Sequence, residues 1–306
     1  MIAIGESIHV ISPRVREAID GREEKFLQEL AVKQVAGGAQ MLDLNIGPQK
    51  KAGPEIMAWM VEIIQRVTDV PLSLDTTNAA AIEAGLKVVK KKALINSTDA
   101  TPQRLEALTP LASKYHAGII ALTLAATGLP TTADARIQLA LESIFPACET
   151  YGVPMEDLYL DPLVLTVNGN QDQAQATIEA VRFFKQMTDP PPKTVCGLSN
   201  ISNGAPNDLR PLINRVFLLM MVGAGLDSAI MDTLDAETME ALRVVGARDE
   251  STPRGRLYLA IHDAYSRGEA FDASAFGPGD SQARDIIRTV QMLENRFLYA
   301  HGYLKV

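Results

Sequence analysis

Short apolar segments alternate with longer amphipathic segments along most of the chain. Eight apolar runs have the length and composition of buried strands: Ile2–Ile8, Met41–Ile46, Leu72–Asp75, Ala93–Asn96, Gly118–Leu124, Leu158–Asp161, Thr194–Leu198 and Asp227–Met231. Eight further segments have the length and periodicity of helices: Glu23–Gly37, Pro54–Val67, Asn78–Lys91, Pro102–Tyr115, Ala133–Tyr151, Asp172–Thr188, Leu209–Val222 and Glu237–Val245. Strands that alternate with helices run parallel, because each crossover helix returns the chain to the same end of the sheet. Eight such repeats predict an α/β fold, a closed (β/α)8 TIM barrel.

A doubly wound nucleotide-binding sheet is the alternative arrangement for alternating strands and helices. That fold requires a Gly-rich turn directly after a strand and before a helix. The nearest match, Gly223-Ala224-Gly225, follows a predicted helix and precedes a predicted strand. In this order a phosphate cannot meet a helix N-terminus. The pattern therefore favours the barrel.

The chain continues beyond the eighth repeat. We expect a barrel over residues 1–250 and a C-terminal helical extension over 251–306. Thr252-Pro253 begins one helix, Phe276-Gly277-Pro278-Gly279-Asp280 forms a loop and Ser281 caps a last helix. Six apolar residues share one face of this last segment: Ile286, Ile287, Val290, Leu293, Phe297 and Leu298. This face is expected to pack on the barrel or to form a subunit contact.

Composition and charge exclude several classes of protein. With 47% hydrophobic and 22% charged residues, the chain is typical of a globular protein rather than a disordered one. Its net charge of −8 disfavours binding to nucleic acid or anionic lipid. The longest apolar run has 11 residues, 216–226, whereas a membrane-spanning helix needs about 20. The first residues lack the features of a signal peptide, and two cysteines build no disulfide framework. We expect a soluble, cytoplasmic protein.

Polar side chains stand at the carboxyl ends of most predicted strands: Glu6, Asp43-Leu44-Asn45, Asp75, Asn96, Asp161, Ser199-Asn200 and Asp232. A single Asp or Asn at such a position is usually the N-cap of the following helix. In these barrels, however, the catalytic and binding residues lie at the carboxyl ends of the strands, where all these side chains would converge. The set therefore predicts a ligand site at one mouth of the barrel. It contains carboxylates and carboxamides and no lysine, which suits a neutral ligand with several N–H donors. A pterin, whose paired N–H groups match one carboxylate, is such a ligand.

Metal and nucleophile sites have little support in the sequence. The four histidines are far apart, and none pairs with another histidine or a cysteine at ligand spacing. Cys196 lies inside a predicted strand, where a buried, inert thiol is expected. Magnesium on the aspartates would ordinarily need a substrate phosphate as well. No protein-bound metal is expected.

Several motifs resemble the pterin-binding barrel family, and within it the methyltetrahydrofolate:corrinoid protein methyltransferases. They occur in order over residues 1–235: Gly5-Glu6-Ser7, residues 38–48 with Asp43-Leu44-Asn45, Leu74-Asp75-Thr76-Thr77-Asn78, residues 81–87, Ile95-Asn96-Ser97-Thr98, residues 154–163 with Asp161-Pro162, Gly197-Leu198-Ser199-Asn200 and Arg210-Pro211-Leu212-Ile213-Asn214-Arg215. The same family contains the folate-binding module of methionine synthase and dihydropteroate synthase. The latter is disfavoured because Leu198-Ser199-Asn200 replaces its basic stretch after the seventh strand.

The resemblance implies roles for individual residues. Asp75, Asn96 and Asp161 would hold the pterin ring, and Asn200 would contact N5, the atom that bears the methyl group. Further substrate-binding positions follow the seventh strand: Gly197, Ser199, Asn203 and Arg210. Three other strand-end residues would support the site: Glu6, Asp43 and Asn45.

The implied reaction moves a methyl group between N5 of 5-methyltetrahydrofolate, the substrate, and the cobalt(I) of a cobalamin-type corrinoid. N5 would be protonated and Asn200 would stabilise it. No histidine stands in an Asp-x-His-x-x-Gly context, so the corrinoid is expected on a separate protein that docks at the barrel mouth. Family members are commonly homodimers, which we also expect here.

The alternatives are a dihydropteroate synthase-like enzyme and a non-catalytic folate-binding subunit. The corrinoid protein could belong to an acetyl-CoA pathway, an O-demethylase or a methylamine or betaine system. The direction of transfer is equally open.

Overall fold

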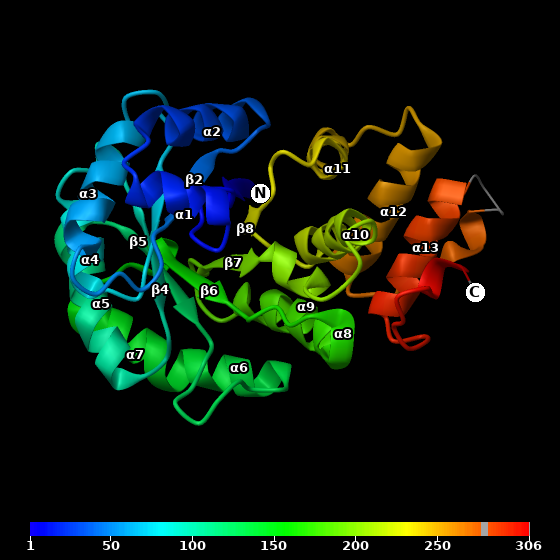
Figure 1. Cartoon of the computed structure of the whole chain (residues 1–306). Helices are drawn as coiled ribbons and strands as arrows, with labels where there is room; N and C mark the ends of the chain where they lie inside the picture. Colours follow the sequence, from blue (N-terminus) through cyan, green and yellow to red (C-terminus); the bar gives the residue numbers. More distant parts are fainter. Residues whose placement is uncertain (277–280, 306) are drawn as a thin grey trace.

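Eight parallel strands close into a barrel in the computed structural model, which describes residues 1–276 and 281–305 (Figure 1). The strands follow one another around the barrel in sequence order: β1 (Ile2–Gly5), β2 (Met41–Asn45), β3 (Leu72–Asp75), β4 (Leu94–Thr98), β5 (Gly118–Leu122), β6 (Leu158–Asp161), β7 (Lys193–Gly197) and β8 (Ser228–Met231). Pairing of β1 with β8, which places Ile2 opposite Ser228, closes the ring. The predicted (β/α)8 barrel is confirmed.

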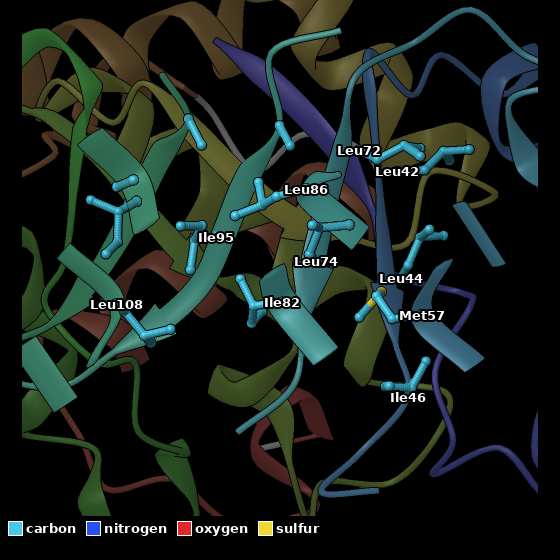
Figure 2. Close-up of a cluster of buried hydrophobic side chains, with 14 of the residues drawn as sticks. Leu42, Leu44, Ile46, Met57, Leu72, Leu74, Ile82, Leu86, Ile95 and Leu108 are labelled. Carbon is cyan, nitrogen blue, oxygen red and sulfur yellow. The ribbon is translucent and has the colours of Figure 1, made fainter. Parts of the chain in front are cut away.

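Helices form the outer layer of the barrel (Figure 1). They are α1 (Pro13–Asp20), α2 (Glu24–Ala36), α3 (Gly53–Ile64), α4 (Ala79–Leu86), α5 (Pro102–Tyr115), α6 (Ala133–Leu139), α7 (Phe145–Tyr151), α8 (Val167–Asn170), α9 (Gln173–Phe184), α10 (Arg210–Gly223) and α11 (Ala236–Ala247). Outward-facing strand residues such as Leu44 and Leu74 pack against helix residues such as Met57 and Ile82 (Figure 2). The hydrophobic core thus lies mainly between the strands and the helices.

Three local features differ from the pattern-based expectation. The segment Ala133–Tyr151 is not one α-helix, because a π-helix over Ala140–Ile144 separates α6 from α7. Pro146 lacks the N–H that would continue the α-helical bonding there. Ser199 and Asn200 do not lie at the end of a strand but in a 3-10 helix, Leu198–Ser202, which follows β7. Helix α1, which was not predicted, begins with Pro13 at its first position.

The C-terminal extension packs against the barrel wall. Helices α12 (Pro253–Arg267) and α13 (Ser281–Leu293) both contact α10 and lie on its outer side (Figure 1). The predicted apolar face holds in part, since Ile286, Val290 and Leu293 are buried. Phe297 and Leu298 lie beyond the end of α13, and Leu298 is 88% exposed. Asn295 has a positive φ of 59°, a conformation that ends a helix. Of the predicted loop Phe276–Asp280, residues 277–280 lie outside the described part of the chain.

Inside the barrel, the inward-facing side chains change from apolar to polar along the axis. Six of them form a buried apolar layer: Ile4, Met41, Leu94, Ile120, Tyr159 and Val195. Because side chains on one face of a strand recur every second residue, Glu6, Asp43, Asn96 and Asp161 follow this layer two residues later on their strands. A polar layer therefore rests on an apolar one at the carboxyl end of the barrel.

In the part of the chain that the structure describes, each helix is too short or too polar to cross a membrane.

Candidate functional site

The predicted strand-end residues of β2, β3 and β4 form one hydrogen-bonded cluster. Ser73 Oγ donates to Asp43 Oδ1 at 2.6 Å, and Asn96 Nδ2 donates to the same oxygen at 3.0 Å. Asn45 Nδ2 donates to Asp75 Oδ2 at 2.5 Å. The strand register creates these contacts, because it places Asp43 opposite Ser73 and Asp75 opposite Asn96. The structure thus brings together all four predicted residues of these strands.

Burial shifts the pKa values of the carboxyl groups in this cluster. It raises the pKa of Asp43, and together with the charge of Asp43 it raises the pKa of Asp75 to about 8. Two carboxyl groups in one poorly solvated site cannot both ionise at low cost. Both carboxyl groups therefore have pKa values above their usual range.

Asp161 ends β6 on the other side of the mouth and is 7% exposed. Its Oδ1 accepts a hydrogen bond from the backbone N–H of Leu163 at 2.7 Å. Burial raises the pKa of Asp161 to about 7, against the opposing effects of this N–H and of the Arg136 guanidinium. Asp161 is thus poised between its two protonation states near neutral pH.

A fourth carboxyl group of the mouth, the partly buried Glu6, follows β1. Ser199 Oγ donates to Glu6 Oε1 at 2.6 Å, although the two residues are 193 positions apart in the sequence. Burial, with smaller contributions from the charges of Asp232 and Asp43, raises the pKa of Glu6 to about 7, while Ser199 and Arg210 oppose the shift. Residues from the first strand and from the segment after the seventh strand therefore meet at the site.

The loop after β7 carries a chain of polar contacts at the rim of the mouth. Asn203 Nδ2 donates to Asn200 Oδ1 at 3.2 Å, and Arg210 Nη2 approaches Asn203 Oδ1 at 3.4 Å. A Cβ atom added to Gly197 would lie 3.0 Å from Asn200 Nδ2, so glycine at this position leaves room for the carboxamide. Asn200 and Asn203 are both exposed. Their amide groups are accessible from solvent.

Sequence reasoning missed two side chains that touch or influence this site. Ser73 lies in an apolar run, but it stands two positions before Asp75, and this spacing placed it on the inner face. Arg136 lies in the last turn of α6, and its sequence context does not differ from that of a surface arginine. In the structure Arg136 is fully buried, and its Nη2 donates to Gln173 Oε1 at 3.1 Å.

The arrangement suits recognition of a polar heterocycle. Buried carboxyl groups and carboxamides supply acceptors and donors in fixed positions, and the described residues contain no group of three or more His, Cys, Asp or Glu placed to hold a metal. Cys196 is fully buried, and burial raises the pKa of its thiol. A thiolate nucleophile is therefore disfavoured at this position.

Comparison with known proteins adds independent findings. The sequence profile of the family described as pterin binding enzyme matches residues 15–232. The chain is 28% identical over 274 residues to a methylcorrinoid:tetrahydrofolate methyltransferase of Eubacterium limosum, covering 88% of this chain and 97% of that protein. It is 30% identical over 241 residues to a methionine synthase of Mycobacterium leprae, covering 76% of this chain but 20% of that longer protein.

Solved structures agree on the architecture. The dihydropteroate synthase of Thermus thermophilus superposes with a TM-score of 0.55 at 22% identity, over 72% of this chain and 87% of that one. At this identity the likeness supports the shared barrel fold alone.

Proposed function

The chain belongs to the pterin-binding enzyme family, and we propose that it moves the N5 methyl group between 5-methyltetrahydrofolate and the cobalt of a corrinoid held by a separate protein. The two sequence relatives named above, from Eubacterium limosum and Mycobacterium leprae, are methyltransferases, which confirms the predicted class of enzyme. The observation that carries the proposal is the barrel mouth, which buried carboxyl groups line and where the exposed carboxamide of Asn200 lies at the rim. A buried acceptor set suits the pterin ring, and an accessible amide suits the atom that reacts with a partner.

The buried residues would bind and orient the pterin. Asp75, Asn96 and Asp161 would pair with its N–H and carbonyl groups. Asn45 is hydrogen-bonded to Asp75 and Asp43 to Asn96, and Ser73 donates in turn to Asp43. Glu6 and Ser199 would border the ring on the β1 and β7 side.

Methyl transfer is a displacement at the methyl carbon. An electron pair of cobalt(I) forms the Co–C bond, and the electrons of the broken C–N bond return to N5. N5 must receive a proton before or during this step, because otherwise it would leave as an anion. Asn200 would stabilise that centre through its carbonyl, which accepts from a protonated N5, or through its NH₂, which donates to the lone pair. In the reverse direction the same contact would stabilise N5 as it takes up the methyl group.

The remaining rim residues would complete the substrate site and its access. Asn203 and Arg210, linked to Asn200 by the contacts above, would hold the loop after β7 against the substrate. We propose that the corrinoid protein docks over this open mouth. We also propose that the chain is a homodimer, with residues 1–250 as the pterin-binding barrel and 251–306 as an extension of its wall.

The decisive experiment offers the purified chain 5-methyltetrahydrofolate and reduced cob(I)alamin, which replaces the protein-bound corrinoid. We expect methylcobalamin and tetrahydrofolate to form in equal amounts. Asp161→Ala should lose activity at low folate concentration, whereas Asp69→Ala, at the amino end of β3, should not. Folate binding without transfer would contradict the proposal in favour of a non-catalytic subunit. Condensation of a pterin diphosphate with p-aminobenzoate would instead indicate a dihydropteroate synthase-like enzyme.

A further inference from the structure

We propose that Gln34 is a positioning residue for the barrel mouth: its side chain holds the backbone beside Glu6, so that the Glu6 carboxyl group stays in the mouth against Ser199. Gln34 lies in α2, in the outer layer of helices, and acts through Glu6 (Figure 1). Its importance for substrate rests on the function proposed above, whereas its effect on Glu6 does not.

A buried hydrogen bond joins the side chain of Gln34 to the segment after β1. Gln34 is fully buried, and its Oε1 accepts from the backbone N–H of Ser7 at 2.8 Å. The preceding backbone N–H, that of Glu6, donates to the carbonyl of Met231 on β8 at 3.1 Å. The backbone of Glu6 is therefore held by β8 on one side and by α2 on the other.

Gly5 leaves the space that this contact requires. A Cβ atom added to Gly5 would lie 2.5 Å from Gln34 Oε1, closer than a Cβ atom tolerates. Successive residues of a strand face opposite sides, so Gly5 faces α2 and Glu6 faces the interior of the barrel. The amide group of Gln34 thus occupies the place that a side chain at position 5 would take.

Packing alone does not explain a glutamine at this position. The backbone N–H of Ser7 requires an acceptor, so the amide oxygen of Gln34 must face it. The Nε2 atom of Gln34 is then buried, and it has no hydrogen-bond partner in the described part of the chain. An unpaired buried donor destabilises a fold, and an apolar side chain would avoid that cost. What glutamine supplies here is the acceptor for Ser7.

The end of α2 is itself fixed against the barrel. The backbone carbonyl of Gln34 accepts from the backbone N–H of Ala39 at 2.9 Å and from Thr233 Oγ1 at 3.3 Å. A Cβ atom added to Gly37 would lie 2.4 Å from the carbonyl oxygen of Thr233, so the helix end is in direct contact with the loop after β8. Gln34 therefore holds Ser7 from a fixed position.

Glu6 carries the effect of Gln34 to the mouth. Its Oε1 accepts from Ser199 Oγ at 2.6 Å, and Asn200, which we propose to contact N5, follows Ser199 directly. Without the bond from Ser7 to Gln34, the backbone beside Glu6 would be free to move, and the carboxyl group could turn toward water. Glu6 would then lose Ser199 and its place beside the pterin.

The titration of Glu6 reports such a movement. Burial is the largest cause that raises the pKa of Glu6 to about 7. The other groups that act on it are Asp43 on β2, Asp232 after β8, Ser199 after β7 and Arg210 on α10. Replacing Gln34 by methionine changes none of these groups, because glutamine and methionine are both neutral. A lower midpoint in that variant would therefore report greater exposure of Glu6 to water.

The first test follows the carboxyl titration of Glu6 by NMR, in the full chain without folate. Glutamate is labelled at the carboxyl group, and the Glu6 signal is assigned by its loss in Glu6→Gln. Gln34→Met is similar in size but lacks the acceptor, so the midpoint should fall from about 7 by at least about one pH unit, toward the usual value of about 4.3.

Two further variants complete the first test. Gln34→Glu retains an acceptor for Ser7 and should keep the Glu6 midpoint at the native value or above it. Gln28→Met is the matched control, because Gln28 lies on the same helix and donates from Nε2 to the carbonyl of Ile63 at 2.9 Å. It loses a hydrogen bond of the same kind and should leave the Glu6 midpoint unchanged.

The second test is a double-mutant cycle on the affinity for 5-methyltetrahydrofolate, measured by calorimetry. Gln34→Met should weaken binding about 3- to 10-fold, the usual effect of one lost hydrogen bond. In a Glu6→Ala background the same substitution should have no further effect, because Gln34 acts through Glu6. Equal losses in both backgrounds would show a general structural role and would overturn the inference. Failure of the native chain to bind folate would contradict the proposed function and leave the titration test intact.

An unchanged Glu6 midpoint in folded Gln34→Met would also overturn the inference. If Gln34→Met does not fold, Gly5→Ala takes its place, because the added Cβ atom displaces the same amide group from the side of the strand. A lower Glu6 midpoint in Gly5→Ala supports the inference, and a native midpoint overturns it. Failure of both variants to fold would overturn it as well, since Gln34 would then serve the fold as a whole.

Discussion

Replacing Asn200 by alanine is expected to slow methyl transfer far more than it weakens the fold. The side chain is exposed and makes one long hydrogen bond, from Asn203 Nδ2 at 3.2 Å. An exposed hydrogen bond of this kind contributes at most about 1 kcal/mol to stability. The variant should therefore fold, and its kinetics can be interpreted directly.

The expected kinetic effect is larger because the contact would strengthen as charge changes at N5. Loss of one preorganised polar contact to a reacting centre costs about 2 to 4 kcal/mol, or roughly 30- to 1000-fold in rate. An interaction made mainly in the transition state appears in kcat, whereas a simple anchor appears in substrate affinity. The decrease in transfer rate at saturating substrate thus distinguishes a catalytic role of Asn200 from a role in substrate binding alone.

The assay is a single turnover with excess enzyme, saturating 5-methyltetrahydrofolate and cob(I)alamin, followed by the loss of cob(I)alamin absorbance. We expect a decrease of at least about tenfold in the transfer rate of Asn200→Ala. The decrease should lessen at lower pH, where solvent protonates N5 more readily. Asn207→Ala, an exposed asparagine of the same loop, serves as the control and should transfer at the native rate. Native-like transfer by Asn200→Ala at saturation would refute the proposed role of this side chain.

Three further predictions concern affinity, stability and assembly. Asp161→Ala and Asp75→Ala should each leave ligand N–H groups unpaired in a buried site. The affinity for 5-methyltetrahydrofolate should then fall roughly 5- to 150-fold, about 1 to 3 kcal/mol. Native affinity of both variants in calorimetry would contradict the assignment of these residues to the pterin. Burial raises the pKa of Glu6 to about 7, so between about pH 5 and pH 7 the unfolded chain loses a proton that the folded chain retains, and the free energy of unfolding falls as pH rises. Glu6→Gln lacks this ionisable group. The difference in free energy of unfolding between the variant and the native chain, measured by urea denaturation, should therefore be about 1 to 2 kcal/mol more favourable to the variant at pH 8 than at pH 5. An equal difference at both pH values would contradict this prediction. Light scattering should give a mass near twice the 33.1 kDa of one chain, and a monomer mass at micromolar concentration would exclude the dimer.

The sequence pattern predicted the strands and most of their polar ends, because both follow from local periodicity. Asp75 and Asn96 stand at the ends of short apolar runs, and a parallel barrel brings such ends to one mouth. The same reasoning could not place Ser199 in a 3-10 helix, since nothing in Leu198-Ser199-Asn200 distinguishes a strand end from a turn of helix. It placed Phe297 and Leu298 on a helix that ends at Leu293.

Partners distant in the sequence were beyond this kind of inference. The hydrogen bond between Ser199 and Glu6 joins the segment after β7 to the end of β1, and the register of β7, β8 and β1 determines it. The burial of Arg136 likewise depends on how α6 packs against α9. Local patterns report which residues are polar, whereas the pKa of each group depends on which others lie beside it in space.

The apolar layer beneath the polar mouth has a kinetic consequence. This layer fills the barrel interior below the polar residues, so the site opens only at the carboxyl end of the barrel. It consists of Ile4, Met41, Leu94, Ile120, Tyr159 and Val195. On the proposed function, the folate and the corrinoid protein share that entrance, and the folate occupies the deeper position. The folate then has to arrive before the larger partner docks and cannot leave until that partner has gone. Steady-state kinetics should show a compulsory order, with folate binding first and tetrahydrofolate released last.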